Sequence, residues 1–339
     1  MNSTYNLNLA LLDGKELKDF LQLSSNTNVD DLIKKSLLDP LKSMMSRPRK
    51  SFRGDLVEFS FSIAKEQNLA GTQDFETATN CAVTILEILH TGSLVIDDIQ
   101  DGSQERRGAP SAHHQYGIPV ALNSGNWLYF YPTVIIEHMP IPESHKPNLF
   151  KEIQNTLLKA HYGQALDVGI PFDSVDPIRL KEVSAASREL KTGALSALAS
   201  KMGVISYGAN QDILLAMDEF GRRFGVALQM FDDIGSLHTV DKTKWIEDLR
   251  LKRITYVVAT ASEIMSKDEF KNFVSLVDQN DFTAVRNYLI EKQVLCFAQK
   301  YATSYLDDSI TKLQQQILLS PSQIQFLQNL KLRLTKAYG

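Results

Sequence analysis

Three aspartates and two arginines stand close together behind an apolar run: Asp97, Asp98, Asp101, Arg106 and Arg107. On a helix, Asp97 and Asp101 lie one turn apart and point the same way. Carboxylates so close repel one another and attract hard divalent cations. Mg²⁺ takes few carboxylates and keeps several waters, which suits a substrate that carries phosphates. The spacing therefore predicts a site for magnesium and a diphosphate.

The residues before this motif favour a buried position for its carboxylates. The stretch Cys81–Ile96 is largely apolar, with Glu87 as its one charge, which is typical of a buried helix. Burial of a carboxylate without a counterion costs several kcal/mol, so a metal and the arginines must compensate for it. The competing interpretation is an acidic, solvated end of a helix.

A second acidic pair ends another apolar stretch. Asp232 and Asp233 follow the run that begins at Gly225, and Gln229 precedes them on the same helix face. Negative charge at a helix C-terminus is opposed by the helix dipole, so without metal the pair would be poorly placed. Two acidic helices that face each other in a bundle would hold metals around one diphosphate. By contrast, the pair Asp307–Asp308 lacks a third carboxylate and nearby arginines and is predicted to be solvated surface.

The elements that position these residues are predicted to be helices. Pro and Gly are scarce, and hairpin signals between alternating apolar runs are nearly missing. Apolar residues recur at helical spacing in Ala194–Ile205, Ile213–Ile234 and Phe270–Ile290. We therefore expect an all-α fold, with one domain over residues 29–339 after an N-terminal segment, residues 1–28.

The composition excludes several classes of protein. With 339 residues, 43% of them hydrophobic, the chain can bury a large core. Its net charge of −4 argues against a nucleic-acid partner. Cys81 and Cys296 form no metal-ligand spacing. We find no apolar stretch of membrane-spanning length and no signal-peptide pattern near the N-terminus, and so expect a cytoplasmic protein without a transmembrane segment.

These residues, in this order, resemble the trans-isoprenyl diphosphate synthases. The segment His90–Asp101 with Arg106–Pro110 is similar to the family's first aspartate-rich motif. Four further elements of the family are also matched. Gly163-Gln164 with Asp167 match GQxxD, and Lys191–Gly193 match KT. Gln229 with Asp232–Asp233 match QxxDD, and Glu247–Leu249 match the start of D-L-x-x-G-K. Within the family, Ile118–Asn126 and the form of the second motif are most similar to geranylgeranyl diphosphate synthases. The resemblance implies a single-domain isoprenoid-synthase-type helical bundle around a central cavity, and a homodimer.

The resemblance also implies a role for each site residue. Ionisation of an allylic diphosphate leaves a diphosphate anion, which metals and cationic side chains stabilise as the C–O bond breaks. Asp97, Asp101 and Asp232 would bind Mg²⁺ directly, and Asp98 and Asp233 would be ligands or partners of ligands. The implied catalytic residues are Asp97, Asp98, Asp101, Arg106, Lys191 and Asp232. The implied substrate-binding residues are Lys50, Arg53, His90, Arg106, Arg107, Lys191, Thr192, Gln229, Lys244 and Arg253.

The expected reaction joins isopentenyl diphosphate to dimethylallyl, geranyl or farnesyl diphosphate. Lys50, Arg53, His90 and Arg107 would bind the diphosphate of isopentenyl diphosphate by resemblance. Gly92 and Ser93, just before the first motif, are small and leave room for a long chain. We therefore expect a twenty-carbon product, geranylgeranyl diphosphate.

The chain departs from the family pattern at five positions. Ser236 stands where many members carry a third aspartate; Lys252 replaces glycine, Arg253 lysine, Val257 proline, and Arg49 the glycine of G-K-x-x-R. Because Arg49, Ser51 and Val257 indicate that the second-substrate side has drifted, a class I terpene cyclase or an altered prenyl transferase is an open alternative. A noncatalytic partner subunit is another, although such a subunit should have lost its first acidic motif.

Overall fold

The computed structural model describes residues 21, 29–47, 51–67, 74–238 and 244–338. The predicted N-terminal segment, apart from Leu21, and the predicted site residue Lys50 lie outside them. The regular elements of the described residues are helices, apart from one short antiparallel pair of strands, β1 (Glu105–Arg106) and β2 (Ala109–Pro110). The chain divides into two compact units, a first unit of residues 1–153 and 201–209 and a second unit of residues 154–200 and 210–339. The single domain over residues 29–339 stays a prediction.

The first unit contains the first acidic motif. Its central helix is α5 (Phe75–Asp101), which packs against α4 (Phe52–Glu66) and α7 (Ile118–Phe130). Two helices contribute residues to both units, α9 (Lys146–Gly169) and α11 (Ala194–Ser206). The other elements of the first unit are α2 (Asp30–Ile33), the π-helical turn η3 (Lys34–Leu38), α3 (Asp39–Met45), α6 (Ala112–Tyr116), α8 (Pro132–His138) and the short 3₁₀ helix η4 (Glu143–His145).

Local sequence signals define both ends of α5. Asp74 caps its N-terminus, and the Asp74 carboxylate accepts the N–H of Thr77 at 3.1 Å. At the C-terminus Gly102 adopts the left-handed conformation, φ +67°, which terminates the helix directly after Asp101. The three aspartates of the first motif are therefore the last residues of a long, mostly buried helix, as predicted.

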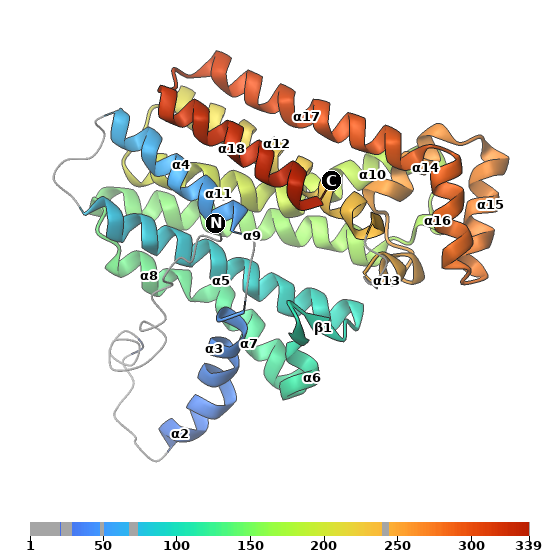
Figure 1. Cartoon of the computed structure of the whole chain (residues 1–339). Coiled ribbons are helices and arrows are strands. Elements are labelled where there is room, and N and C mark those ends of the chain that lie inside the picture. The colour runs from blue at the N-terminus through green and yellow to red at the C-terminus, as the bar shows by residue number, and fades with distance from the viewer. Residues whose placement is uncertain (1–20, 22–28, 48–50, 68–73, 239–243, 339) are drawn as a thin grey trace. The chain divides into compact units, whose positions relative to one another are not determined.

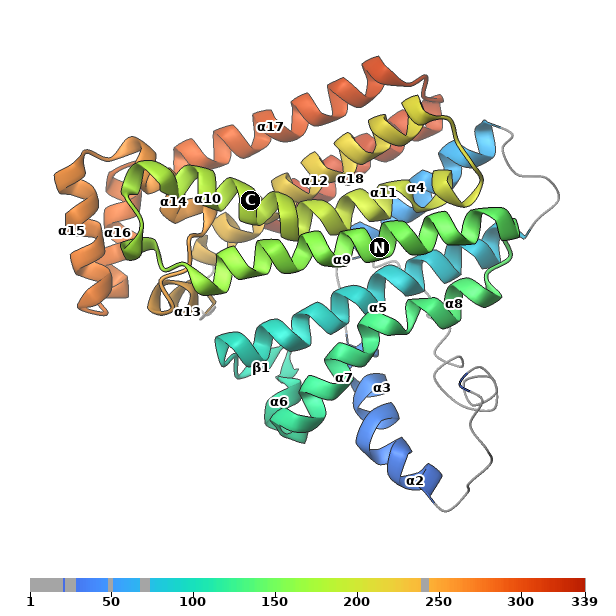
Figure 2. The same ribbon diagram turned by 180° about the vertical axis from the view of Figure 1, so that it is seen from behind.

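Helices α5 and α7 lie side by side and approach closely at two glycines (Figures 1 and 2). A Cβ on Gly92 would lie 2.9 Å from the carbonyl oxygen of Gly125, and a Cβ on Gly125 would lie 3.0 Å from the side chains of Val95 and Ile96. The small size of Gly92 is therefore required by helix packing. Of the two small residues that were expected to leave room for the product, Ser93 alone remains a candidate.

Helix α5 corrects the expectation that the sequence has no apolar stretch of membrane-spanning length. By length and composition α5 would be long and apolar enough to cross a bilayer, whereas the sequence was expected to contain no such stretch. In the structure 61% of its most apolar window is buried inside the protein. This burial is typical of a core helix.

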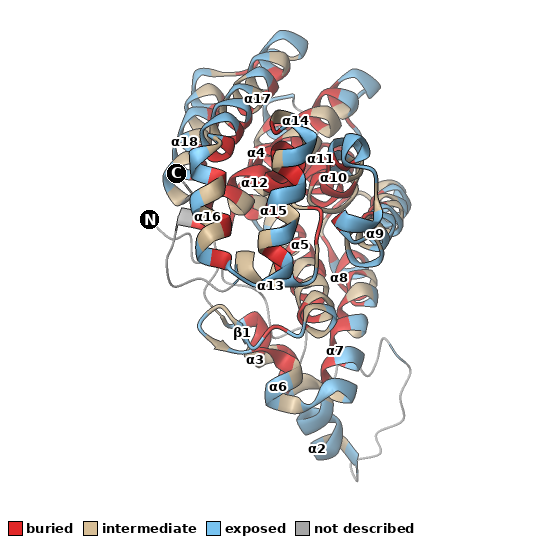
Figure 3. Cartoon of the chain, turned by 90° about the vertical axis from the view of Figure 1, so that its right-hand side faces the viewer, coloured by how far each residue is buried: buried red, intermediate tan, exposed pale blue. Residues whose placement is uncertain are grey.

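The second unit is built around α12 (Gln211–His238), which packs against α17 (Val294–Gln316), α18 (Pro321–Tyr338) and α14 (Tyr256–Ile264). Figure 3 shows buried residues along α12, while α15 (Lys267–Asp278) and α16 (Phe282–Glu291) carry many exposed ones. The remaining elements are η5 (Phe172–Ser174), η6 (Pro177–Arg179), α10 (Leu180–Arg188), the π-helical turn η7 (Glu189–Gly193) and α13 (Lys244–Arg250).

Glycines on α12 bring this helix close to η7 and α11. A Cβ on Gly225 would lie 2.5 Å from the carbonyl oxygen of Thr192 and 2.7 Å from Ser196 Oγ. A Cβ on Gly221 would collide with Ser200 Oγ. The close approach places Thr192 of η7 beside Gln229 on α12.

Candidate active site

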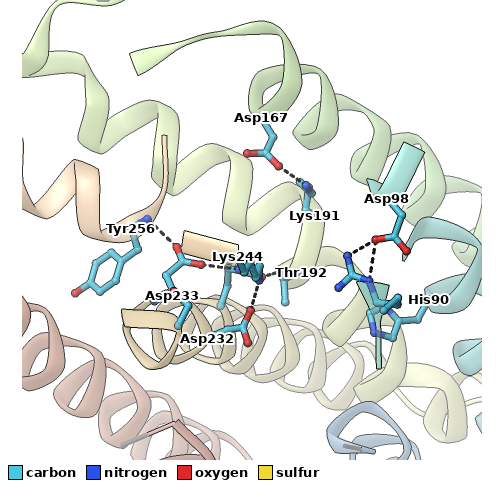
Figure 4. Close-up of polar contacts among 12 residues, drawn as sticks. His90, Asp98, Asp167, Lys191, Thr192, Asp232, Asp233, Lys244 and Tyr256 are labelled. Carbon is cyan, nitrogen blue, oxygen red and sulfur yellow. Dashed lines mark hydrogen bonds and ion pairs between the residues drawn. The ribbon is translucent and has the colours of Figure 1, made fainter. Parts of the chain in front are cut away.

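In the first acidic motif, one aspartate is bound by an arginine. Asp98 is only 2% exposed, and its Oδ1 accepts hydrogen bonds from Nε of Arg106, at 2.8 Å, and from Nη2 of the same guanidinium (Figure 4). Burial raises the pKa of Asp98 above its usual value, and Arg106 opposes that shift. Asp97 and Asp101 lie on the same end of α5 and are partly exposed.

A short hairpin holds Arg106 in this position. Strands β1 and β2 are joined by a tight turn in which Arg107 and Gly108 have φ values of +56° and +76°. Arg47 donates from Nη1 to the carbonyl oxygen of Arg106 at 3.2 Å and from Nη2 to Gln115 Oε1 at 3.1 Å. Arg47 therefore anchors the arginine hairpin, a role that the sequence analysis missed.

Cationic residues surround His90 in the first unit. Nη1 of Arg53 lies 3.3 Å from His90 Nε2, and because a guanidinium only donates, Nε2 must be the acceptor. Burial, followed by the charges of Arg53, Arg107 and Arg106, holds the pKa of His90 well below 6.5. His90 is therefore neutral at physiological pH, and the positive charge of this group comes from the arginines. Of the predicted isopentenyl-binding residues, Arg53, His90 and Arg107 thus lie near one another.

We expect the imidazole of His90 to remain neutral from about pH 8 down to about pH 6.5, the ordinary pKa of histidine, because protonation would add a buried charge beside three arginines. The measurement is an NMR titration of the ring resonances, assigned with a His90→Gln variant. A midpoint at or above the ordinary value would contradict the neutral state assigned to His90.

A hydrogen-bonded chain holds the second acidic motif. Thr192 Oγ1 donates to Gln229 Oε1 at 2.9 Å, and Gln229 Nε2 donates to Asp233 Oδ1 at 2.7 Å. The backbone N–H of Tyr256, the first residue of α14, donates to Asp233 Oδ2 at 2.8 Å (Figure 4). Both carboxylate oxygens of Asp233 are thereby engaged by the protein. Burial raises the pKa of Asp233, against the opposing charge of Lys244.

The neighbouring Asp232 contacts a lysine near the surface. Its Oδ2 lies 2.6 Å from Lys244 Nζ, and the Lys244 side chain is 45% exposed. The negative charge of Asp232 raises the pKa of Lys244. Lys244, a predicted substrate-binding residue, therefore lies directly at the second acidic motif.

Asp167 joins two further predicted cations in the second unit. Its carboxylate forms an ion pair with Lys191, and its backbone carbonyl accepts from Arg253 Nη1 at 2.9 Å (Figure 4). Asp167 belongs to the GQxxD element but was not predicted as a site residue. Gly163 permits the contact between α9 and η7, because a Cβ there would lie 2.7 Å from the Lys191 side chain.

The structure explains two departures from the family pattern. Lys252 has φ +55°, a left-handed conformation in which glycine carries no steric penalty, and its ammonium forms ion pairs with Asp173 and Asp278. Ser236 Oγ donates at 2.8 Å to the carbonyl oxygen of Asp233 on its own helix. The second motif therefore has two carboxylates.

The donor atoms fit magnesium rather than a softer metal. Among the residues that the structure describes, no three His, Cys, Asp or Glu side chains cluster as a preformed metal site. Mg²⁺ is usually held by one or two carboxylates together with waters and substrate phosphates. Asp97, Asp101 and Asp232 offer hard carboxylate oxygens of this kind, and neither cysteine belongs to these motifs.

A family model described as polyprenyl synthetase matches residues 34–291, most of the chain. The chain belongs to the polyprenyl synthetase family. The chain is 29% identical over 294 residues to a geranylgeranyl pyrophosphate synthase of Penicillium ochrochloron, covering 84% of this chain and 76% of the relative. It is 28% identical over 239 residues to the geranylgeranyl diphosphate synthase of Sulfolobus acidocaldarius, covering 68% and 72%.

Solved structures share the fold of this chain. The geranylgeranyl pyrophosphate synthetase of Pyrococcus horikoshii superposes with a TM-score of 0.76 at 22% identity, over 96% of this chain and 95% of that chain. A geranylgeranyl pyrophosphate synthase of Corynebacterium glutamicum, complexed with isoprenyl diphosphate and magnesium, also reaches 0.76 at 16% identity, over 96% and 97%. The predicted family and the predicted all-α, isoprenoid-synthase-type fold are confirmed. The roles of the site residues stay predictions.

Proposed function

We propose that this protein condenses isopentenyl diphosphate with dimethylallyl, geranyl or farnesyl diphosphate in the presence of Mg²⁺ and releases geranylgeranyl diphosphate. Prenyl transfer as the class of reaction follows from the family, and the relatives named geranylgeranyl diphosphate synthase support the product. The observation that carries the two-substrate reaction is the cationic group of Arg53, His90 and Arg107 in the same unit as the first acidic motif. An enzyme with a single prenyl substrate does not need a second diphosphate pocket.

The proposed metal ligands are Asp97, Asp101 and Asp232. We assign Asp98 and Asp233 to positioning rather than to direct metal binding, because Oδ1 of Asp98 and both carboxylate oxygens of Asp233 already accept hydrogen bonds from the protein. Bound Mg²⁺ would supply positive charge that stabilises the departing diphosphate.

The cationic side chains would act on the same leaving group. Arg106 and Lys191 each form an ion pair with a carboxylate, and a guanidinium or an ammonium group can also donate to a diphosphate oxygen. As the allylic C–O bond breaks, its electron pair stays on the diphosphate. The double bond of isopentenyl diphosphate attacks the cation, a C–C bond forms, and the released diphosphate accepts the proton that restores a double bond. No side chain is assigned as the base.

The test is incorporation of labelled isopentenyl diphosphate with each of the three allylic starters, followed by phosphatase treatment and mass measurement of the alcohol. A twenty-carbon alcohol whose formation needs Mg²⁺ is the expected result. An exclusively fifteen-carbon product would overturn the proposed length, and no incorporation with any starter would overturn the proposed reaction.

We expect Ser93→Phe to shorten the product from twenty to fifteen carbons. Ser93 precedes Asp97 by one turn and is partly exposed, so a bulky ring there would fill the space that the growing chain occupies. The measurement is chromatography of products from farnesyl diphosphate, on which the variant should stall, and from geranyl diphosphate, which it should extend once. Unchanged twenty-carbon product would exclude Ser93 as the stop.

The two alternative functions are less well supported. A terpene cyclase has a single prenyl substrate and would not need the cationic group of Arg53, His90 and Arg107. A noncatalytic partner subunit does not explain the intact Asp98–Arg106 pair. Activity of the purified protein alone with Mg²⁺ would dispose of the partner-subunit hypothesis, and hydrocarbon release without isopentenyl diphosphate would favour the cyclase.

The proposal includes a homodimer of cytoplasmic subunits. Helix α7 exposes Ile118, Leu122 and Phe130, with exposed fractions of 55%, 42% and 71%, and large exposed apolar side chains favour a protein contact. Light scattering of the purified protein should give the mass of two chains. A mass of one chain, 38.1 kDa, at assay concentration would contradict it.

A further inference from the structure

Arg188, the last residue of α10, is a buried guanidinium in the second unit. It is 9% exposed, and among the described residues no carboxylate lies within ion-pair distance of it. Nη1 donates to Ser184 Oγ, while Nε is buried without a hydrogen-bond partner. Such a group costs stability, because an apolar side chain of similar size would need no desolvation of a charge. Its presence needs an explanation other than stability.

The guanidinium lies over the ring of Tyr256, with its central carbon 4.9 Å from the ring centroid. Tyr256 is itself fixed at three points, since its hydroxyl also donates to the carbonyl oxygen of Ala298 on α17 at 3.1 Å. The third point is its backbone N–H, which donates to Asp233 Oδ2 at 2.8 Å. The contacts thus run from Arg188 through Tyr256 to the second acidic motif.

The electrostatics support the same connection. Burial lowers the pKa of Arg188, and Asp233 is first among the groups that oppose the shift. Arg188 therefore interacts with the charge of Asp233, although Tyr256 stands between them in the chain of contacts. The positive charge compensates in part for the partly buried carboxylate of Asp233, and the stacked ring fixes the backbone N–H that binds it.

We propose that Arg188 is a positioning residue, which acts through Tyr256 to hold Asp233 as a hydrogen-bond acceptor of the protein, so that Asp232 alone in this motif is presented to magnesium and diphosphate. The proposal rests on the proposed function, since it concerns the same diphosphate site. The proposal also accounts for valine in place of the family's proline at position 257. The start of α14 is fixed instead by the contacts of Tyr256 and by the Thr255 cap, whose Oγ1 accepts the N–H of Val258 at 3.3 Å.

The chain offers a matched control in the same unit. Arg223 on α12 also lies over a tyrosine, with its central carbon 4.3 Å from the ring of Tyr305, but it forms an ion pair with Asp308 at 2.5 Å and has no contact with the acidic motif. Arg223→Met therefore removes a similar stacking interaction without touching the connection to Asp233.

The experiment measures binding of inorganic diphosphate to the purified full chain at several Mg²⁺ concentrations by calorimetry, together with the midpoint of thermal unfolding. Arg188→Met is expected to weaken magnesium-dependent diphosphate binding about 10- to 100-fold while its unfolding midpoint stays unchanged or rises. Arg188→Lys, which keeps a cation over the ring, should recover part of the affinity. Arg223→Met should lower the midpoint and bind diphosphate as the parent does.

Parental affinity in Arg188→Met would overturn the inference. A fall in its unfolding midpoint as large as that of Arg223→Met would overturn it as well, because Arg188 would then be a structural residue. Failure of the parent itself to bind diphosphate with Mg²⁺ and to incorporate isopentenyl diphosphate would instead contradict the proposed function.

Discussion

Replacement of Asp97 or Asp232 by alanine is expected to lower kcat by at least about 100- to 1,000-fold, the range seen when one group that stabilises developing negative charge is removed. Both carboxylates are proposed to bind the Mg²⁺ that stabilises the leaving diphosphate. Both are partly exposed, so their loss should leave the fold intact and even relieve repulsion from Asp98 and Asp233. The measurement is steady-state condensation of farnesyl and isopentenyl diphosphates at saturating Mg²⁺.

The control for this prediction is Asp307→Ala. Asp307 also belongs to an aspartate pair, but it is 45% exposed and forms an ion pair with Lys331 on α18. Its removal should change kcat by less than about twofold, because exposed ion pairs away from the site contribute little. Retention of full turnover by both Asp97→Ala and Asp232→Ala would contradict the proposed metal site.

The second large effect is on stability. Arg106→Met is expected to lower the free energy of unfolding by about 3 kcal/mol at neutral pH, because it leaves Asp98, which is 2% exposed, as a buried carboxylate without its partner. The measurement is urea denaturation followed by circular dichroism. A double variant, Arg106→Met with Asp98→Asn, should regain about 2 kcal/mol, since no buried charge then remains.

The loss of unfolding free energy in Arg106→Met should grow as the pH rises from about 4 to neutral. Burial already raises the pKa of Asp98, and loss of Arg106 removes the interaction that lowers it. The folded variant then binds a proton more readily than the unfolded chain, so its stability falls as the pH rises above the unfolded-state pKa of about 4. The difference from the parent should therefore be largest at neutral pH and shrink toward pH 4. If the difference in unfolding free energy between Arg106→Met and the parent does not change with pH, the charge of Asp98 is not its cause.

Residue type and spacing were sufficient to predict the acidic motifs and the helices that carry them. The run before Asp97 is apolar, Asp74 caps the helix and Gly102 ends it, so each local signal agrees with the observed α5. In the second motif Gln229 precedes Asp233 by one turn and donates to it, as the spacing predicted, but α12 runs on to His238 and does not end at the aspartates.

Contacts between distant segments could not be read from the chain. Gly92 was interpreted as room for the product, yet its neighbour is the carbonyl oxygen of Gly125 on another helix. Arg47 and Arg188 carried no motif, and their roles depend on Arg106 and Tyr256, which lie 59 and 68 positions away. The left-handed backbone at Lys252 likewise gives no signal, because the residue type disfavours that conformation.

The central claim is that cleavage of the allylic diphosphate is coupled to attack by isopentenyl diphosphate. The most direct measurement is release of inorganic diphosphate from farnesyl diphosphate with Mg²⁺, in the presence and absence of labelled isopentenyl diphosphate. The account predicts one diphosphate released for each isopentenyl unit incorporated and almost none when isopentenyl diphosphate is omitted. Release at the same rate without isopentenyl diphosphate would contradict it.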